Sequence, residues 1–356
     1  MKQLLFTIIL VALAFSVNAQ NYYSENIYCC SDSVRLSGTL TYPSNEGQFP
    51  AVIIISGTGK QDRDGTFANH HPFFEIADYL TKRGFAVLRM DDRGVGKSAG
   101  IYEEATTTDF ANDICSEIEF LKTKEMIDTS RIGLIGHSEG GAVAFMVAAN
   151  SPDISFIVSL AGLAIDGYQS LILQNRALLE SSPNMEQSLI EAYMNLYTLM
   201  FKTVKDIPLN TDVEPELRMK FQSWLEKQTD DELKAMNMIH GREQMFLSRY
   251  IWMAKGKWYR QMIRYNPADY ITKIKVPVLA LNGNKDLMVT PKENLNAIAN
   301  YLKQANNENY TIIELKDHNH MFQHCIECTQ MEIPTLPEAI SDETLETIGK
   351  WLIHQF

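Results

Sequence analysis

The sequence predicts an α/β fold with a mostly parallel central sheet, helices on both faces of that sheet, and an inserted helical cap. Three observations predict it. Short apolar segments alternate with amphipathic helical segments through the first half of the chain. The alternation stops between residues 163 and 266, where only helical patterns rich in Met and aromatic residues occur. It resumes at residue 276 with two further strand-like segments and a closing amphipathic helix.

The first 19 residues have the features of a signal peptide. Lys2 supplies a positive charge, residues 4–17 are almost wholly apolar, and Ala19 ends a small-residue cleavage site. The apolar run is short for a membrane span, and polar residues follow it at once. We therefore expect a mature chain from about Gln20 that is periplasmic or secreted in a bacterium, with no membrane attachment after cleavage. A retained N-terminal anchor is the alternative.

The elements before the insertion follow from side-chain periodicity. Residues 26–42 alternate between apolar and polar, which is typical of an antiparallel hairpin. Residues 51–55 are continuously apolar, as expected for a parallel strand that is covered on both faces. Further strands are predicted at 85–89, 131–135 and 156–160, and helices at 73–83, 109–122 and 141–149.

The chain is long enough for one large α/β domain with an insertion. We assign residues 20–162 and 267–356 to the α/β core, with strands at 276–281 and 310–315 in its second part. Residues 163–266 are assigned to a helical cap over the carboxyl edge of the sheet, because they lie between two predicted strands of that sheet. An independent helical domain is the alternative.

The charge balance excludes some classes of partner. The formal net charge is −12, and both nucleic acids and anionic membrane surfaces require clustered Lys and Arg in the protein that binds them. We therefore predict no nucleic-acid partner and no membrane partner. The acidic balance otherwise indicates solubility and identifies no particular ligand.

Five cysteines lie in the predicted mature chain, an odd number for an oxidising compartment. Cys325 and Cys328 are close enough in the sequence to form a disulfide. Cys29 and Cys30 are adjacent on a predicted strand, so their side chains are expected on opposite faces. Cys115 lies in a helical pattern and is predicted to be a buried free thiol. Redox catalysis is disfavoured, because the Cys-x-x-Cys pair does not begin a helix after a strand.

The G-x-S-x-G pattern at residues 136–140 is the most informative part of the chain. An apolar strand segment precedes it and a helical segment of small residues follows it, which is the context of a nucleophile elbow. Glycines on both sides of the serine allow the strand and the helix to cross closely. The pattern makes Ser138 a candidate nucleophile for acyl transfer.

An acid and two histidines follow Ser138 in the order that this chemistry uses in such a fold. Asp286 lies directly after the first strand beyond the insertion, and His318 and His320 lie directly after the next strand. A serine nucleophile needs a base to take its proton and a third group to orient that base. Asp286 is the candidate orienting acid, although turn chemistry also favours aspartate at that position. Spacing does not decide between His318 and His320, and His324 is a further option.

Two backbone N–H groups are expected to stabilise the negative charge that develops during acyl transfer. One belongs to Glu139, the residue after the candidate nucleophile. The other is expected in the glycine-bearing loop at residues 56–59, which follows a predicted strand. Within that loop Thr58 is the candidate donor. A plain glycine turn is the alternative.

Four stretches resemble secreted bacterial carboxylesterases of the α/β-hydrolase superfamily, in a branch that includes serine-aminopeptidase-like proteins. They are residues 56–64, 91–98, 136–141 and 319–323. The likeness extends over most of the predicted mature chain and is weakest over the cap. It implies the α/β-hydrolase fold and, because the catalytic histidine of that branch lies in an Asn-His-x-Phe stretch, it implies His320 as the base. Lys60 stands where the first stretch of that branch has proline.

Two other patterns suggest different chemistry. Residues 94–98 resemble a phosphate-binding loop, but Asp91 stands where that motif requires glycine. The histidines and cysteines between residues 318 and 328 are dense enough to suggest zinc. Their spacing fits no common zinc site, and thiolates outside the cell tend to oxidise. We therefore predict neither a metal nor a cofactor.

Together these features predict a secreted serine esterase, a hydrolase that cleaves carboxylic esters through an acyl-enzyme. Its catalytic residues are predicted to be Ser138, Asp286 and His320, and its substrate a small-molecule ester. The first alternative is a serine peptidase that acts on short peptides and binds their amino group through an acidic residue of the cap. The candidates for that residue are Glu180, Glu186, Glu191 and Asp212. The others are a zinc-dependent hydrolase and an inactive binding protein with this fold.

Overall fold

A computed structural model describes residues 22–355 of the chain. The predicted signal peptide at residues 1–19 lies outside this range, so the structure does not test it. No helix within residues 22–355 combines the length and the apolar character needed to cross a lipid bilayer.

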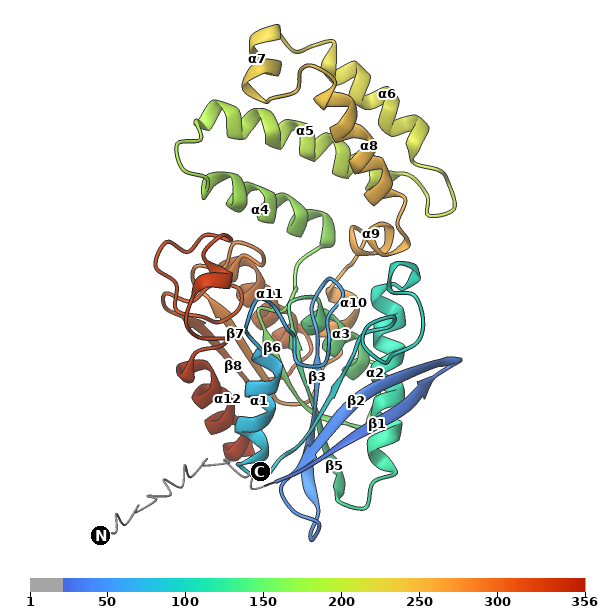
Figure 1. The fold of residues 1–356 in the computed structure, drawn as a ribbon, viewed down its shortest axis with the longest axis vertical. Helices are drawn as coiled ribbons and strands as arrows, with labels where there is room; N and C mark the ends of the chain where they lie inside the picture. The colour runs from blue at the N-terminus through green and yellow to red at the C-terminus, as the bar shows by residue number, and fades with distance from the viewer. Residues whose placement is uncertain (1–21, 356) are drawn as a thin grey trace, which may run out of the picture.

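Eight strands form one sheet at the centre of the molecule (Figure 1). They are β1 (Tyr23–Ser31), β2 (Val34–Tyr42), β3 (Phe49–Ile55), β4 (Ala86–Met90), β5 (Ile127–His137), β6 (Ile154–Leu160), β7 (Val278–Gly283) and β8 (Tyr310–Leu315). Their order across the sheet is β1-β2-β4-β3-β5-β6-β7-β8. The pairs β1–β2 and β2–β4 are antiparallel, and all other neighbouring pairs are parallel. The predicted mostly parallel sheet is confirmed.

Helices cover both faces of this sheet. The helices of the α/β part are α1 (Pro72–Thr81), α2 (Thr107–Lys122), α3 (Glu139–Ala148), α10 (Ala268–Ile271), α11 (Pro291–Gln304) and α12 (Asp342–Gln355). α1 and α12 pack with Val52 of β3 in one apolar cluster. α2, α3, α10 and α11 pack with Ile53 in a second cluster. Because neighbouring residues of a strand point to opposite faces, the continuous apolar run of β3 supplies both clusters.

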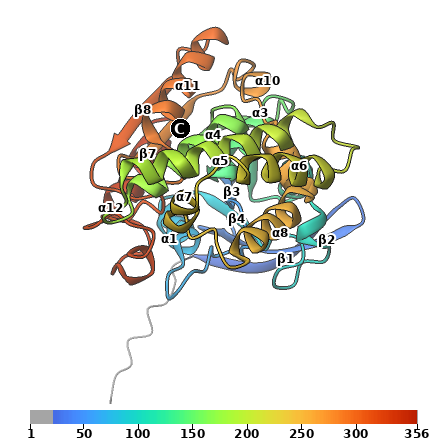
Figure 2. The ribbon, with the colours of Figure 1, turned by 90° about the horizontal axis from the view of Figure 1, so that it is seen from above.

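A block of helices lies between β6 and β7 in the sequence and above the sheet in Figure 1. They are α4 (Gly167–Glu180), α5 (Gln187–Asp206), α6 (Glu214–Leu225), α7 (Asp230–Ala235), α8 (Arg242–Ala254) and α9 (Lys257–Met262). We call α4 to α9 the cap. Its helices extend across the sheet when the molecule is seen from above (Figure 2). Aromatic residues such as Phe201, Phe221 and Tyr250 give the cap an apolar cluster of its own.

Local capping explains why α2 begins earlier than its apolar stripe predicts. The hydroxyl of Thr106 accepts a hydrogen bond from the backbone N–H of Asp109, and the Asp109 carboxylate accepts one from the backbone N–H of Thr106. This reciprocal capping box satisfies two N–H groups that have no partner inside the helix. Two short 3₁₀ helices, η1 (Tyr102–Glu104) and η2 (Ile333–Thr335), complete the elements.

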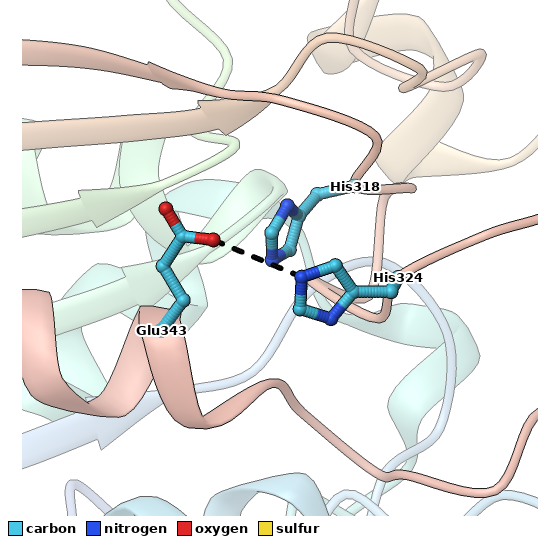
Figure 3. A group of neighbouring side chains, drawn as sticks. All are labelled: His318, His324 and Glu343. Atoms are coloured by element: carbon cyan, nitrogen blue, oxygen red, sulfur yellow. Dashed lines mark ion pairs between the residues drawn. The ribbon is translucent and has the colours of Figure 1, made fainter.

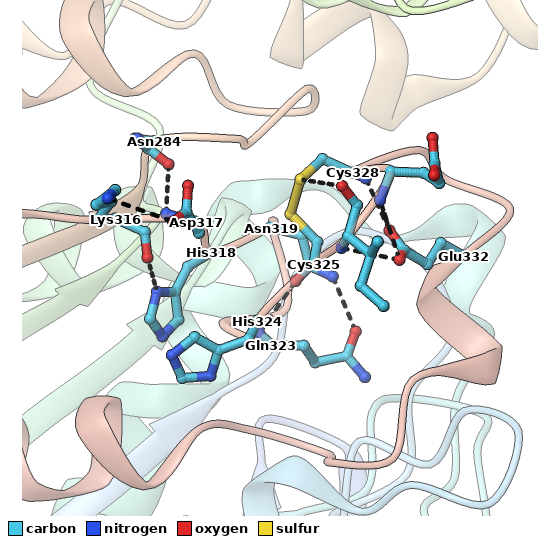
Figure 4. Close-up of a disulfide and its surroundings, with 12 residues drawn as sticks. Asn284, Lys316, Asp317, His318, Asn319, Gln323, His324, Cys325, Cys328 and Glu332 are labelled. Atoms are coloured by element: carbon cyan, nitrogen blue, oxygen red, sulfur yellow. Dashed lines mark hydrogen bonds and ion pairs between the residues drawn. A yellow bond between two sulfur atoms is a disulfide. The ribbon is translucent and has the colours of Figure 1, made fainter.

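Two of the five cysteines form a disulfide, Cys325–Cys328, in the loop after β8 (Figure 4). The Glu332 carboxylate accepts hydrogen bonds from the backbone N–H groups of Ile326 and Cys328, at 2.9 and 2.7 Å. The Glu332 carboxylate therefore holds the backbone of the four-residue turn that the disulfide closes.

The three remaining cysteines are free. Cys29 is buried and Cys30 is exposed, which confirms that they point to opposite faces of β1. The prediction that Cys115 is buried is wrong, because Cys115 is exposed. The buried stripe of α2 runs through Ile114 and Ile118, and the next residue along a helix is rotated by about 100° away from such a stripe.

Candidate active site

Ser138 lies at the sharp turn between β5 and α3. Its backbone has φ 56° and ψ −120°, a conformation that costs free energy for a residue with a side chain. A Cβ atom at Gly136 would lie 2.1 Å from the carbonyl oxygen of Gly140, and one at Gly140 would lie 2.4 Å from that of Ile55. Only glycine fits both positions, which is the physical reason for the G-x-S-x-G pattern.

Asp286 and His320 lie together at the carboxyl ends of β7 and β8. The Nδ1–H of His320 donates to Oδ2 of Asp286 at 2.7 Å. The other carboxylate oxygen accepts hydrogen bonds from the backbone N–H groups of Met288 and Val289, at 2.7 and 2.9 Å. Asp286 is buried, so these bonds fix its orientation. Because Nδ1 carries the proton, Nε2 of His320 is left as an acceptor.

The sequence did not decide which of three histidines pairs with Asp286, and the structure gives each of them a different partner. Nδ1–H of His318 donates to the carbonyl oxygen of Lys316, and Nε2 of His318 lies 2.7 Å from the Ser341 hydroxyl. His324 is hydrogen-bonded to the Glu338 carboxylate. His320 is therefore the histidine that pairs with Asp286.

Ser138 and His320 line the same cavity. Within residues 22–355 the Ser138 hydroxyl forms no hydrogen bond. In this conformation it is therefore not hydrogen-bonded to Nε2 of His320. Such contacts in hydrolases often shorten only when the substrate binds. The two side chains thus share one space, in which Asp286 orients the imidazole.

Thr58 and Glu139 flank Ser138 on the side of β3. No partner among the described residues accepts a hydrogen bond from the backbone N–H of either residue. The backbone N–H of Gly59, by contrast, donates to the Tyr102 hydroxyl at 2.8 Å. The N–H groups of Thr58 and Glu139 are therefore left for a ligand.

The Glu139 side chain is the centre of a network that the sequence did not reveal. It is buried, and its carboxylate accepts hydrogen bonds from the hydroxyls of Thr58 and Thr107 at 2.8 and 2.6 Å. A third comes from the indole N–H of Trp258, in the cap helix α9, at 2.7 Å. The residue that carries one free N–H group is thus tied to the opposite loop, to α2 and to the cap. The sequence indicated Trp258 only as one of several cap aromatics.

The two aspartates after β4 hold the loop that contains Thr58. Asp92 accepts hydrogen bonds from the Ser56 hydroxyl at 2.7 Å and from the backbone N–H of Gln61 at 2.8 Å. Asp91 accepts bonds from the backbone and the guanidinium of Arg63. Burial raises the pKa of Asp92 to about 7, against the effect of its two hydrogen bonds.

His137, the residue before Ser138, was not singled out by the sequence. Its Nε2–H donates to the carbonyl oxygen of His320 at 2.9 Å, so it joins the turn that carries Ser138 to the loop that carries His320. Burial, with a smaller contribution from His320, lowers its pKa to about 3. His137 therefore stays neutral and acts as a fixed hydrogen-bond donor.

A cavity of about 560 Å³ lies between the carboxyl edge of the sheet and the cap. Such a volume is typical of small-molecule sites. Ser170, Leu171 and Gln174 of α4, with Trp258 and Met262 of α9, form its cap side. Glu139 is the one carboxylic acid among its lining residues, and Lys60 is the one lysine or arginine. Lys60 is exposed and forms an ion pair with Glu103 at 2.6 Å.

Comparison with known proteins gives one family. Residues 32–321 match the model of the X-Pro dipeptidyl-peptidase (S15) family. Esterase EstD of Thermotoga maritima is 25% identical over 287 residues, which cover 80% of this chain and 58% of EstD. An acyl transferase of Vibrio harveyi is 36% identical over 124 residues, which cover 35% of this chain and 37% of the transferase.

Solved structures give the same fold at low identity. An esterase of Pyrococcus furiosus superposes with a TM-score of 0.53 at 17% identity, over 94% of this chain and 92% of its own. DcsB, solved with a substrate analogue, superposes with a TM-score of 0.55 at 15% identity, over 93% of this chain and 99% of its own. These likenesses support the α/β-hydrolase fold, and no residue role is transferred from them.

Proposed function

The chain belongs to the X-Pro dipeptidyl-peptidase (S15) family of serine hydrolases, and from that premise we propose that it hydrolyses carboxylic esters through an acyl-enzyme. The nucleophile in this proposal is Ser138, the base is His320 and the orienting acid is Asp286. The supporting observation is a cavity that contains the first two residues and offers no free carboxylate to a peptide amino group.

The proposed reaction begins when the Ser138 oxygen attacks the ester carbonyl carbon. Nε2 of His320 takes the hydroxyl proton, and the buried Asp286 carboxylate stabilises the imidazolium that forms. The tetrahedral intermediate collapses when His320 returns the proton to the leaving alcohol. Water then attacks the acyl-enzyme by the same route and releases the carboxylic acid.

In this proposal the carbonyl oxygen binds to the backbone N–H groups of Thr58 and Glu139. Its negative charge grows in the transition state, so donors held in place there lower the barrier. The three hydrogen bonds to the Glu139 side chain and the two to Asp92 hold these donors without blocking them.

The charges in the cavity support the proposed preference for esters over peptides. An enzyme that removes a dipeptide from a free amino terminus needs an anionic partner for the ammonium group. Glu139 is the single carboxylic acid of the lining, and three donors already occupy it. The four acidic cap residues that the sequence suggested do not line the cavity. Of these, Glu191 pairs with Arg176 and Asp212 with Lys255.

Secretion remains part of the proposal. The signal-peptide pattern at residues 1–19 and the Cys325–Cys328 disulfide support a periplasmic or extracellular location, because disulfides persist mainly in oxidising compartments.

A comparison of substrates tests the proposed function. We expect the purified protein to hydrolyse p-nitrophenyl acetate or butyrate with a kcat/KM at least about 100-fold above that for an aminoacyl-prolyl nitroanilide, a gap of about 3 kcal/mol in transition-state binding. Glu191→Gln and Asp212→Asn serve as matched controls and should leave both activities within about twofold. Faster cleavage of the nitroanilide, or its loss in either variant, would refute the ester assignment.

A further inference from the structure

The loop that carries His320 also brings together three side chains that the proposed reaction does not use. They are His318, His324 and Glu343 (Figure 3). His318 and His324 face each other across an isolated antiparallel bridge, with their ring centres 4.2 Å apart. Glu343 lies in the first turn of α12. One atom from each side chain, two ring nitrogens and one carboxylate oxygen, lies within 4.8 Å of the others.

We propose that His318, His324 and Glu343 bind a divalent transition-metal ion, with zinc the best fit, and that the ion fastens the His320 loop to α12. Two imidazole nitrogens and one carboxylate oxygen form a donor set that zinc accepts, with water as the fourth ligand. Mg²⁺ and Ca²⁺ prefer oxygen ligands alone and are disfavoured by this set.

The orientation of both imidazoles suits a metal. Nδ1 of His318 is held by the carbonyl oxygen of Lys316 at 2.7 Å, and Nδ1 of His324 by the Glu338 carboxylate at 3.0 Å. Metal-binding histidines usually donate one ring N–H to a carbonyl or a carboxylate, which leaves the other nitrogen as the ligand. Here both Nε2 atoms are left, and that of His324 already lies 3.7 Å from Oε2 of Glu343.

The distances need only a small adjustment. Ligand atoms of a tetrahedral zinc ion lie about 3.4 Å apart when each bond is about 2.05 Å. His318 is fully buried and fixed. The side chains of His324 and Glu343 are 52% and 56% exposed, so there is room for them to rotate toward His318. Rotation of His324 and Glu343 toward the buried His318 can therefore bring the three ligand atoms to the distances that zinc requires.

One existing hydrogen bond must be exchanged for the ion to bind. Nε2 of His318 accepts from the Ser341 hydroxyl at 2.7 Å. That hydroxyl lies 2.8 Å from Oγ1 of Thr344, to which it can donate instead. The metal bond replaces the hydrogen bond at Nε2, and the exchange costs the one O–H donation that His318 accepted.

The other possible metal ligands of this loop already have partners within the protein. Cys325 and Cys328 form a disulfide and offer no thiolate. His320 donates to Asp286. The Glu338 carboxylate, which holds Nδ1 of His324 at 3.0 Å, adds negative charge beside the site and so strengthens the attraction for a cation.

The site lies outside the cavity that Ser138 lines, so its role is distinct from the hydrolytic reaction. An ion bound to His318 and His324 would clamp the two sides of the loop on either side of His320. Because Glu343 belongs to α12, the same ion would join that loop to the helix. We therefore assign the ion a structural role.

Metal binding can be measured on the intact protein without any substrate. Protein freed of metal with a chelator, under non-reducing conditions that keep the disulfide, is titrated with ZnCl₂ against a chromophoric chelator, and thermal unfolding is followed in parallel. We expect one high-affinity Zn²⁺ per chain and a Tm that rises by about 5 °C at a hundredfold excess over Kd. The result should be the same in Ser138→Ala, whatever the substrate of the enzyme.

Two exposed ligands serve as test variants and two exposed residues of α12 as matched controls. His324→Ala and Glu343→Gln should each weaken zinc binding at least about tenfold and, at the same zinc concentration, reduce the rise in Tm by about half or more. His354→Ala and Glu346→Gln should leave both unchanged. Binding that is equal in all four variants would assign the zinc to other groups, such as the exposed thiols of Cys30 and Cys115, and would overturn the proposal. So would a Tm that saturating zinc does not change.

Discussion

The α/β core and the cap contribute to the site in different ways. The core places each candidate catalytic side chain at the carboxyl end of a strand: Ser138 after β5, Asp286 after β7 and His320 after β8. The cap provides apolar walls, a packing cluster of its own, and one hydrogen bond from Trp258 to Glu139. The core thus holds all three side chains of the proposed reaction, whereas the cap forms one wall of the cavity and contacts the core through Trp258.

The largest expected effect tests the core. Ser138→Ala should lower kcat/KM for p-nitrophenyl acetate by about 10⁴-fold or more, because no nucleophile remains. Asp286→Asn should produce a smaller loss, since His320 remains but is no longer oriented by a carboxylate. Steady-state kinetics measure both, with circular dichroism to show that the variants are folded. Hydrolysis by Ser138→Ala at a rate near that of the wild type would refute the assigned role.

The cap should contribute a smaller effect through Trp258. Trp258→Phe keeps the apolar wall but removes the N–H that donates to the buried Glu139 carboxylate. A hydrogen bond to a charged group is worth about 1.5–3 kcal/mol, so a loss in kcat of about tenfold is expected if part of that energy positions the Glu139 N–H.

The separate effects on kcat and KM show whether Trp258 positions Glu139 or only contacts the substrate. If Trp258 acts through Glu139, kcat falls while KM changes little. Thr107→Val, which removes another donor to the same carboxylate from outside the cap, should produce a similar fall. Trp252→Phe is the matched control, because Trp252 is 78% exposed on α8. A change in KM alone would show that Trp258 only lines the cavity and does not position Glu139.

The last expected effect is on stability and not on activity, and it concerns Asp92 in the core. Burial raises the pKa of Asp92 to about 7, whereas an unfolded aspartate titrates near 3.9. The folded state therefore favours the protonated form, and the associated stability, present below about pH 4, is lost as pH rises through 7. Asp92→Asn removes this dependence, so its Tm relative to wild type should rise between pH 4 and pH 8.

The size of that change is bounded. A shift of roughly 3 pK units corresponds to at most roughly 4 kcal/mol. Asparagine can accept the backbone N–H of Gln61 at its carbonyl oxygen and donate its amide N–H to the Ser56 hydroxyl, so the loop that contains Thr58 should stay in place. If Tm changed in the same way with pH in the variant and the wild type between pH 4 and pH 8, ionisation of Asp92 would not destabilise the folded protein, which contradicts this prediction.

Core and cap also differ in how well the sequence predicted them. The sheet, the nucleophile turn and the loop after β3 were predicted from short segments, because their patterns arise from neighbouring residues. The start of α2 and the exposure of Cys115 were not, because a capping box and the edge of a buried stripe are decided by single side chains. For the cap the sequence predicted helices but not which aromatic residue reaches the cavity.

The sequence by itself determined the fold class and the place of the candidate nucleophile, Ser138. A strand-to-helix turn with glycines on both sides is a local steric requirement, and it is legible in five residues. Tertiary structure decided which histidine meets Asp286, 34 residues away in the chain, and that Trp258 reaches Glu139 across 119 residues. It also brought His318, His324 and Glu343 together. The physical reason is that such contacts depend on how distant segments pack, and no local pattern of side chains records that packing.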